Sequence, residues 1–357
     1  MKTYIKFLVT TFLKSFVYVL CVLLSLVFIL NILTELEFFK EINVDVYFTL
    51  LLSFLNTPSM IFEMFPFIFL ITTQLFFIKL FNNKEIEIFK YSGLKNSSII
   101  FVVSIVALVT GIAIITLYYN FSSNLKNFYL GLKSSYTKDG KYLAVITQNG
   151  LWIKDEIEEK IIIINSSEIK PNTLVNNFIT VFDKNYISEK NIKSEKIDIS
   201  QKEWIIYDAK LFEENNYLSK KEIKLKTNFD YKRIQSLYSN LSSLNIFLLY
   251  ELRENYKKLN YSLTEVDLQI LKLISYPLYL LLMTIFASLI MLKIKRFDST
   301  TMKIAIGLFF SVIIYYINNF FIVMGNTERM SLIMAILTPL ILLTIVNFLM
   351  INKINDK

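Results

Sequence analysis

Six apolar segments, each long enough to cross a lipid bilayer, constrain the fold of this chain more than any other feature. The first, residues 15–34, contains no charged side chain, and a transmembrane helix needs about 20 apolar residues. A signal peptide would be shorter and would end in small residues at a cleavage site. The other expected spans are residues 58–80, 98–118, 273–292, 304–327 and 330–352. The sequence therefore predicts an α-helical membrane protein with six transmembrane helices, three on each side of an insertion.

The second apolar segment, residues 46–78, is too long for one simple span and contains Pro58 and Pro66. Proline removes a helical hydrogen bond and disfavours helical geometry in the residue before it. We therefore expect a short interfacial helix up to Asn56, followed by the span itself. The one charged residue of the segment, Glu63, lies within about 8 Å of the outer end of that span, since a helix rises about 1.5 Å per residue. Glu63 is either an interfacial acid or a group that handles substrate or protons.

Residues 120–262 differ in character, because charges return and apolar residues fall in short alternating runs. Alternation of this kind predicts short β-strands. The expected strands are residues 142–147, 151–154, 160–165, 178–183, 196–199 and 204–207. Asn149-Gly150 and the acidic residues 155–159 are expected to form solvated turns. Many short strands favour a β-jelly-roll-like domain between two membrane domains, residues 1–119 and 263–357.

Lysine and arginine residues are concentrated in alternate loops, and such loops face the cytoplasm. These basic positions lie at the N-terminus, after the second and fourth spans and in the tail: Lys2, Lys6, Lys14, Lys79, Lys84, Lys90, Lys95, Lys293, Lys295, Arg296, Lys303, Lys353 and Lys357. With six spans, both termini are cytoplasmic and the large β-rich domain is periplasmic. The expected location is a bacterial inner membrane.

The residue types that most enzymes and metal sites require are missing from this sequence. It contains no histidine and one cysteine, Cys21, which excludes Ser-His-Asp catalysis, disulfides within the chain and the usual zinc sites. It has no nucleotide-binding P-loop motif, and its net charge of +8 forms no basic stripe of the kind that binds nucleic acid. A membrane-bound enzyme is therefore the least favoured function, and no cofactor or metal is expected on this chain.

The loop between the second and third spans, residues 83–93, is predicted to contain a short amphipathic helix. Ile86, Phe89 and Gly93 share one face at spacings i, i+3 and i+7, and Gly93 is suited to end the helix. A helix of this kind can dock into a groove on a cytoplasmic partner. An ordinary interfacial helix would show the same pattern, so the pattern leaves both interpretations open.

Glu85, Ser92 and Gly93 form an ExxxxxxSG motif in this loop. The motif resembles the coupling helix of the LptF/LptG family of lipopolysaccharide transport permeases. Further resemblances to that family follow the chain in order: Asn56-Thr57-Pro58, Pro66, Asn149 to Asp155, Glu203-Trp204, Leu249 to Arg253, Lys272 to Pro277, Arg296 to Ser299, Gly307, Tyr315 to Asn319, and Pro339. The segments around Trp152 and Trp204 are similar to the LptG branch. The resemblance covers nearly the whole chain.

The resemblance implies an LptG-type half-transporter in the inner membrane of a Gram-negative bacterium, without an ATPase of its own. Such a subunit pairs with an LptF-like permease, and two LptB-like ATPase subunits bind ATP and Mg²⁺ and move the pair. Lipopolysaccharide leaves the membrane between the permeases and passes along β-jelly-roll grooves with LptC-like and LptA-like proteins. By this resemblance Glu85, Ile86, Phe89 and Gly93 form the coupling helix to the ATPase.

The residues expected to contact lipid are Lys40, Phe178, Trp204, Tyr315 and Phe320. Family members often carry basic residues at the outer end of the first span, and this chain departs from that pattern. The residues found there are Asn31, Thr34, Glu35 and Glu37, with Lys40 nearby. Phosphate contacts at this end are therefore unassigned.

An alternative function is that of a mechanotransmission permease, in which a partner ATPase reshapes the periplasmic domain to signal without moving lipid. Members of that class usually have four spans, so the six spans expected here count against it. Capture of lipopolysaccharide by photo-reactive side chains would distinguish the two functions.

Overall fold

The computed structural model describes most of the chain and divides it into two compact units. The described residues are 3–40, 44–134, 136, 151–157, 160–170, 172–184, 186–213, 216–231, 234, 240–258, 262–293 and 300–355. One unit, Met1–Lys126 with Thr264–Lys357, is helical, and the other, Asn127–Leu263, contains a sheet. The sheet is thus an insertion into a helical chain.

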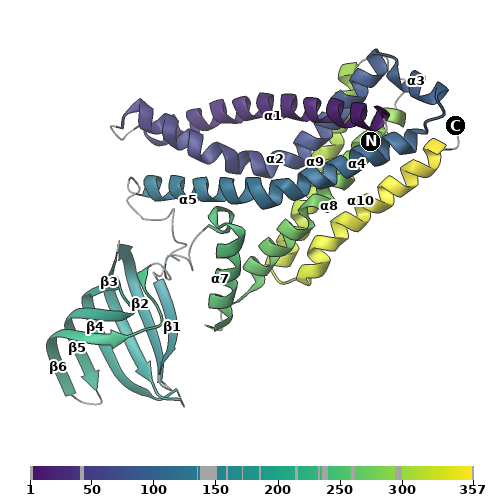
Figure 1. Cartoon of the computed structure of the whole chain (residues 1–357). Helices are drawn as coiled ribbons and strands as arrows, with labels where there is room; N and C mark the ends of the chain where they lie inside the picture. Colours follow the sequence, from purple (N-terminus) through teal and green to yellow (C-terminus); the bar gives the residue numbers. More distant parts are fainter. Residues whose placement is uncertain are drawn as a thin grey trace. The chain divides into compact units, whose positions relative to one another are not determined.

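Among the described residues, six helices are long and apolar enough to cross a membrane, which confirms the predicted spans (Figure 1). They are α1 (Thr3–Phe38), α2 (Val46–Asn82), α4 (Asn96–Ala113) with its continuation α5 (Asn120–Ser134), α8 (Thr264–Lys293), α9 (Thr300–Asn326) and α10 (Leu332–Asn355). A π-helical segment, Ile114–Tyr119, joins α4 to α5. The shorter helices α3 (Glu85–Tyr91) and α7 (Ile246–Lys258) connect α2 to α4 and follow the sheet, respectively.

α2 runs without a break through Pro58 and Pro66, so the predicted interfacial helix before Pro58 is wrong. Proline has no N–H, and Pro66 therefore leaves the carbonyl oxygen of Phe62, four residues earlier, without its helical donor. The Tyr276 hydroxyl of α8 donates to this oxygen at 2.5 Å. The Tyr118 hydroxyl donates to the Pro58 carbonyl at 3.0 Å. The neighbouring helix α8 thus supplies the donor that is missing at Pro66, as a transmembrane helix requires, whereas the Tyr118 bond ties the π-helical segment to α2.

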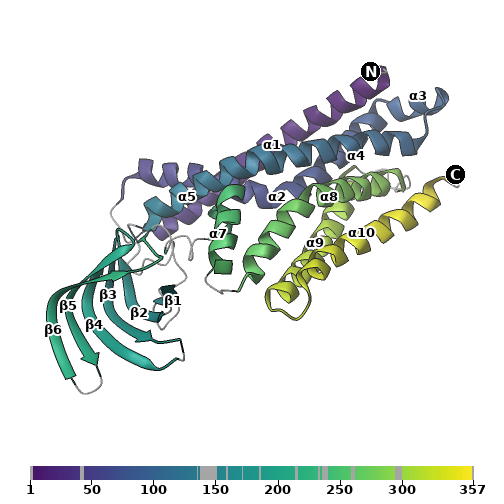
Figure 2. The ribbon, with the colours of Figure 1, turned by 60° about the horizontal axis from the view of Figure 1, so that its bottom comes forward.

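The insertion contains one antiparallel sheet, in which the six described strands follow one another in chain order (Figure 2). The strands are β1 (Leu151–Ile157), β2 (Lys160–Lys170), β3 (Thr173–Phe182), β4 (Ser188–Asp198), β5 (Glu203–Glu213) and β6 (Asn216–Lys226). The first five match the strands predicted from residue 151 onward, although the predicted strands 178–183 and 196–199 run one residue past the ends of β3 and β4. The strand predicted at residues 142–147 lies outside the described residues. β6 was not predicted, because lysines interrupt its apolar alternation. Lysine-rich strands are typical of exposed sheet edges.

Asp155 lies within β1 and is buried, so the solvated turn predicted to begin there is wrong at this position. Its carboxylate accepts hydrogen bonds from the backbone N–H and the side-chain amide of Asn228, both at 2.8 Å. A buried carboxylate is tolerated only when donors of this kind satisfy it. The contact ties the first strand to the segment that follows β6.

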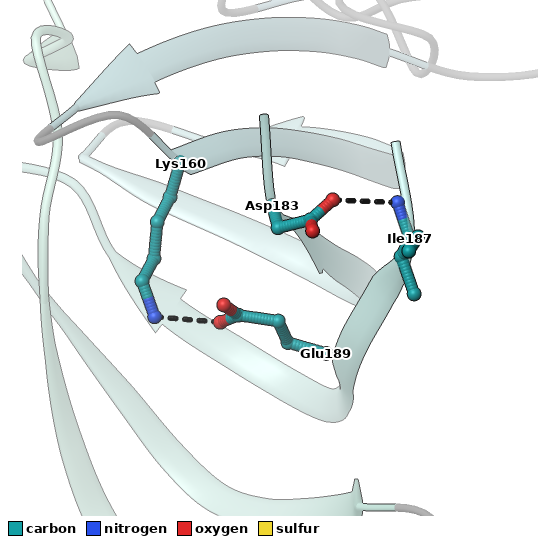
Figure 3. A network of polar contacts seen from close by, with 4 residues as sticks. All are labelled: Lys160, Asp183, Ile187 and Glu189. Carbon is teal, nitrogen blue, oxygen red and sulfur yellow. Dashed lines mark hydrogen bonds and ion pairs between the residues drawn. The ribbon is translucent and has the colours of Figure 1, made fainter. Parts of the chain in front are cut away.

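Polar contacts also fix the connection between β3 and β4 (Figure 3). The Asp183 carboxylate accepts a hydrogen bond from the Ile187 N–H at 2.8 Å and closes the turn. Lys160, at the start of β2, forms an ion pair of 2.6 Å with Glu189 of β4. Both members of this pair are exposed, so the pair contributes little to stability.

A line of irregular pairing crosses the sheet and changes the alternation of its strands. Asn176 and Asp208 have left-handed backbone angles, with φ of 52° and 47°, and neither is paired with the strands beside it. In β3 the buried residues are therefore Leu174 on one side of the line and Asn177, Ile179 and Val181 on the other. The pairing of β3 with β2 and β4 keeps the same register on both sides of Asn176, so the line adds no residue relative to the neighbouring strands, and the buried face continues across it.

Candidate functional site

The connector helix α3 is bounded at both ends by residues with left-handed backbone geometry. Lys84 precedes it with a φ of 58°, and Gly93 follows it with a φ of 78°. The Gly93 N–H donates to the Lys90 carbonyl at 2.9 Å. The Leu94 N–H donates to the Phe89 carbonyl, also at 2.9 Å. These two bonds form a Schellman motif, in which glycine is the favoured residue, and the prediction that Gly93 ends the helix is confirmed.

The two apolar anchors predicted for α3 face the rest of the chain. Ile86 is 4% exposed, and the ring of Phe89 meets the ring of Phe7 on α1 edge-on, with 6.1 Å between centroids. Ile88 and Tyr91 lie three residues apart on the other side of the helix, and both are exposed, Tyr91 by 91%. The apolar surface that α3 leaves open is therefore made by Ile88 and Tyr91. The sequence pattern identified an apolar face but could not indicate that α1 would cover it.

The Glu85 carboxylate, at the start of α3, has one satisfied and one unsatisfied oxygen. Oε1 accepts a hydrogen bond from the Asn83 amide at 3.1 Å. Oε2 is buried and has no hydrogen-bond partner among the described residues. Burial of a carboxylate oxygen without a donor is costly.

The helices α1 and α9 are covered by the rest of the chain far less than α2 and α8. The buried share of the most apolar stretch is 17% in α1 and 11% in α9, whereas it is 72% in α2 and 67% in α8. Apolar side chains such as Leu33 on α1 and Phe320 on α9 face outward. Both helices thus offer apolar surface to lipid or to another membrane protein.

Three of the residues predicted to contact lipid lie on or beside these two helices. Lys40 is exposed, two residues after the end of α1. Tyr315 and Phe320 are exposed on α9, and the Tyr315 ring lies 5.5 Å from the ring of Phe67 on α2. All three side chains are accessible from outside the chain.

The two aromatic residues predicted to contact lipid in the sheet lie on opposite faces of it. Trp204 is fully buried, and its indole N–H donates to the Phe229 carbonyl at 2.8 Å. Phe178 is exposed, because its neighbours in β3, Asn177 and Ile179, occupy the buried face. Trp204 is therefore a core residue, and of the two only Phe178 can meet a ligand outside the sheet.

Within the described ranges, no group of three carboxylate or cysteine side chains is arranged to hold a metal ion. Cys21 is a free, exposed cysteine on α1. The side chains on the open surfaces of α1, α3 and α9 can supply apolar contact and hydrogen bonds, the interactions that a membrane lipid or a protein partner requires.

Six membrane-length helices, an inserted antiparallel sheet and a short connector helix with an open apolar face define a multi-pass membrane protein of the permease class. The family model described as "Lipopolysaccharide export system permease LptF/LptG" matches residues 6–353, nearly the whole chain. The chain belongs to the LptF/LptG family, as its motifs predicted, and this membership supports a role in lipopolysaccharide export. The match covers both branches of the family, so the LptG assignment stays a prediction. No curated protein matches the chain significantly.

Proposed function

We propose that this chain is the LptG-type member of a permease pair that extracts lipopolysaccharide from the inner membrane with energy from separate ATPase subunits. Family membership supports the lipopolysaccharide part of this function. The observation that carries the motor part is the open surface of α3, where Ile88 and Tyr91 are exposed. Beside it, Glu85 holds a buried oxygen that lacks a donor within the described residues.

The chain contains no P-loop motif, so the energy must come from a partner. In the proposed complex, each permease binds one LptB-like ATPase subunit, which holds ATP and Mg²⁺. Ile88 and Tyr91 fill a groove of the ATPase. Phe89 transmits the motion to α1, because its ring packs against Phe7 of that helix.

The second permease of the pair, an LptF-like subunit, would cover the open sides of α1 and α9. Lipopolysaccharide would occupy the space between the two permeases, with Tyr315 and Phe320 of α9 beside its acyl chains and Lys40 near its polar end. Acyl chains need apolar area rather than polar contacts, and each buried methylene contributes about 0.8 kcal/mol. The exposed apolar side chains of α1 and α9 can provide that area.

The sheet is proposed to lie in the periplasm, with both termini of the chain in the cytoplasm, as the positions of the lysines predict. The lipid would pass from the membrane to this domain and onward to LptC-like and LptA-like proteins. Edge strands expose unpaired backbone groups, to which a neighbouring domain can add a strand. Among the exposed aromatic residues of the sheet, Phe178 is the one that we expect to lie near the lipid.

Photo-crosslinking in membranes that contain the whole complex tests this function. We expect a photo-reactive residue at Tyr315 or Phe320 to capture lipopolysaccharide, and ATP to change the yield. The matched control is Phe348, an exposed aromatic residue toward the opposite end of the membrane on α10, where little capture is expected. Capture of phospholipid alone, with no effect of ATP, would instead favour a permease that transmits motion without moving lipid.

A further inference from the structure

The helical unit contains a cavity whose wall carries opposite charges. It has a volume of about 200 Å³ and lies among α2, α8, α9 and α10, which pack side by side in Figures 1 and 2. Its polar lining comes from Glu63 on α2, Lys272 and Ser275 on α8, and Asn318 and Asn319 on α9. A larger cavity of about 450 Å³ among α8, α9 and α10 is lined almost entirely by apolar side chains. The smaller cavity is thus a polar recess in an apolar bundle.

Glu63 and Lys272 line this recess without bonding to each other. Among the described residues, neither side chain forms a hydrogen bond or an ion pair, although Lys126 on α5 attracts Glu63 electrostatically. Charged side chains within membrane helices are costly, and those that occur usually face a cavity and serve a function. Two opposite charges on one cavity wall form a receptor for a ligand that carries both signs.

The recess lies close to one end of α8 and α9, whereas Glu63 lies near the middle of the longer helix α2. Lys272 is eight residues from the start of α8, and Asn319 is seven residues from the end of α9, so both lie about 10–12 Å from those ends along the helix axis. With the orientation proposed above, these ends face the periplasm. At this depth the recess is level with the polar headgroups and upper chains of the outer leaflet.

The polar groups match an ammonium group linked to a phosphate. The Glu63 carboxylate and the amide oxygens of Asn318 and Asn319 can accept hydrogen bonds from a primary ammonium. Lys272 and the Ser275 hydroxyl can donate to phosphate oxygens. A quaternary ammonium has no N–H to donate, so this acceptor set favours a primary amine. A cavity of this size holds several waters, which is enough room for an ethanolamine phosphate group.

We propose that the recess formed by Glu63, Lys272, Ser275, Asn318 and Asn319 binds the headgroup of a zwitterionic phospholipid with a primary amine. Phosphatidylethanolamine has this chemistry. The recess adjoins the open surface of α9, because Tyr315 also lines it, but its polar wall suits a small zwitterionic headgroup, so it would hold a structural or regulatory lipid rather than the exported one. Its occupant would bridge α2 to α8 and α9.

Lipid retention by the assembled complex tests the proposal. The complex is purified from vesicles that contain equal amounts of phosphatidylethanolamine, phosphatidylcholine and phosphatidylglycerol, washed in detergent, and its retained lipids are quantified by mass spectrometry. We expect at least about fivefold enrichment of phosphatidylethanolamine over phosphatidylcholine, which differs only in the methylation of its nitrogen. Equal retention of these two lipids would overturn the proposal without any variant being made.

Two variants then locate the site. Glu63→Gln and Lys272→Met should each abolish most of the enrichment. Their matched controls are Glu37→Gln, at the end of α1, and Lys293→Met, at the other end of α8, which should preserve it. Enrichment that survives both site variants would place the lipid elsewhere and refute the assignment. The readout needs neither lipopolysaccharide nor ATP, so its failure would leave the proposed export function untouched.

Discussion

The hydroxyl of Tyr276 on α8 donates to the backbone carbonyl of Phe62 on α2 at 2.5 Å. That carbonyl lacks its helical donor because Pro66 lies four residues later. The two rings also stack, with 4.9 Å between centroids and 19° between planes. One residue of α8 therefore both packs against α2 and completes its backbone hydrogen bonding at the proline.

Removing this hydroxyl should weaken the helical unit while preserving its packing. Tyr276→Phe leaves the stacked ring and exposes no new surface, but it leaves a buried carbonyl unsatisfied, at a cost of about 1–3 kcal/mol. Thermal unfolding of the purified protein in detergent measures the loss. Tyr316→Phe, at an exposed tyrosine on α9, is the control. Equal melting temperatures for the two variants would show that the bond contributes nothing.

The two faces of α3 should respond differently to truncation. Tyr91→Ala and Ile88→Ala remove exposed side chains, so they should preserve the stability of the chain. Loss of an aromatic anchor from an interface costs about 2 kcal/mol or more, so Tyr91→Ala should sharply reduce recovery of the ATPase during co-purification. Glu87→Gln, at an exposed position on the same helix, is the control.

Ile86→Ala should instead destabilise the chain, because it empties a buried site, and such changes cost about 2–5 kcal/mol. The melting temperature of this variant should therefore be lower even when no ATPase is present. If Ile86→Ala were stable but failed to bind the ATPase, and Tyr91→Ala bound normally, the docking face would be the one first predicted from the sequence.

Gly93→Ala should be destabilising for a conformational reason alone. An added Cβ would meet no atom within 4 Å, but the φ of 78° is unfavourable for alanine, at a cost of roughly 1–2 kcal/mol. Gly131→Ala on α5 also meets open space, and there alanine should be neutral or stabilising, because glycine weakens a helix by about 0.5–1 kcal/mol. We expect Gly93→Ala to lower the melting temperature and Gly131→Ala to leave it unchanged or raise it. Gly93→Asn should recover part of the stability that Gly93→Ala loses.

Asp155→Ala should destabilise the sheet domain both in β1 and in the segment around Asn228, which is far from Asp155 in the sequence. It removes the carboxylate that accepts two hydrogen bonds from Asn228, and a hydrogen bond to a charged group contributes about 1.5–3 kcal/mol. Hydrogen exchange should become faster both in β1 and in the segment around Asn228. Asp183→Ala, which removes one bond in the exposed β3–β4 turn, should affect only that turn. Unchanged exchange around Asn228 would contradict the prediction.

The six spans could be predicted from the sequence, because crossing a membrane requires only sufficient length and apolarity. The continuity of α2 through Pro66 could not, because the hydroxyl group that satisfies the freed carbonyl belongs to Tyr276, far away in the chain. For the same reason the sequence showed that α3 has an apolar face but not that Phe7 would cover Phe89. Asp155 was misassigned because its partner, Asn228, lies beyond five further strands.

The candidate site was predicted in part. The ExxxxxxSG motif correctly indicated the family, and Tyr315 and Phe320 are accessible as expected. Trp204 is buried because the alternation of β5 directs it inward, and that alternation was visible in the sequence. The polar recess was not predicted, because Glu63, Lys272 and Asn318 come from three separate segments, and nothing in the sequence indicates that they meet.

The left-handed residues Asn176 and Asp208 also determine where the sheet can accept changes in chain length. Leu174 and Ile179 are five residues apart, a separation that would place them on opposite faces of a regular strand. Both are buried because the left-handed residue between them resets the alternation. Deletion of Asn176 would leave them four residues apart and on one face, but it would shift the register of one half of β3 against β2 and β4. A change of length at this line in one strand would therefore have to be matched in its neighbours, whereas each hairpin turn can change its length independently.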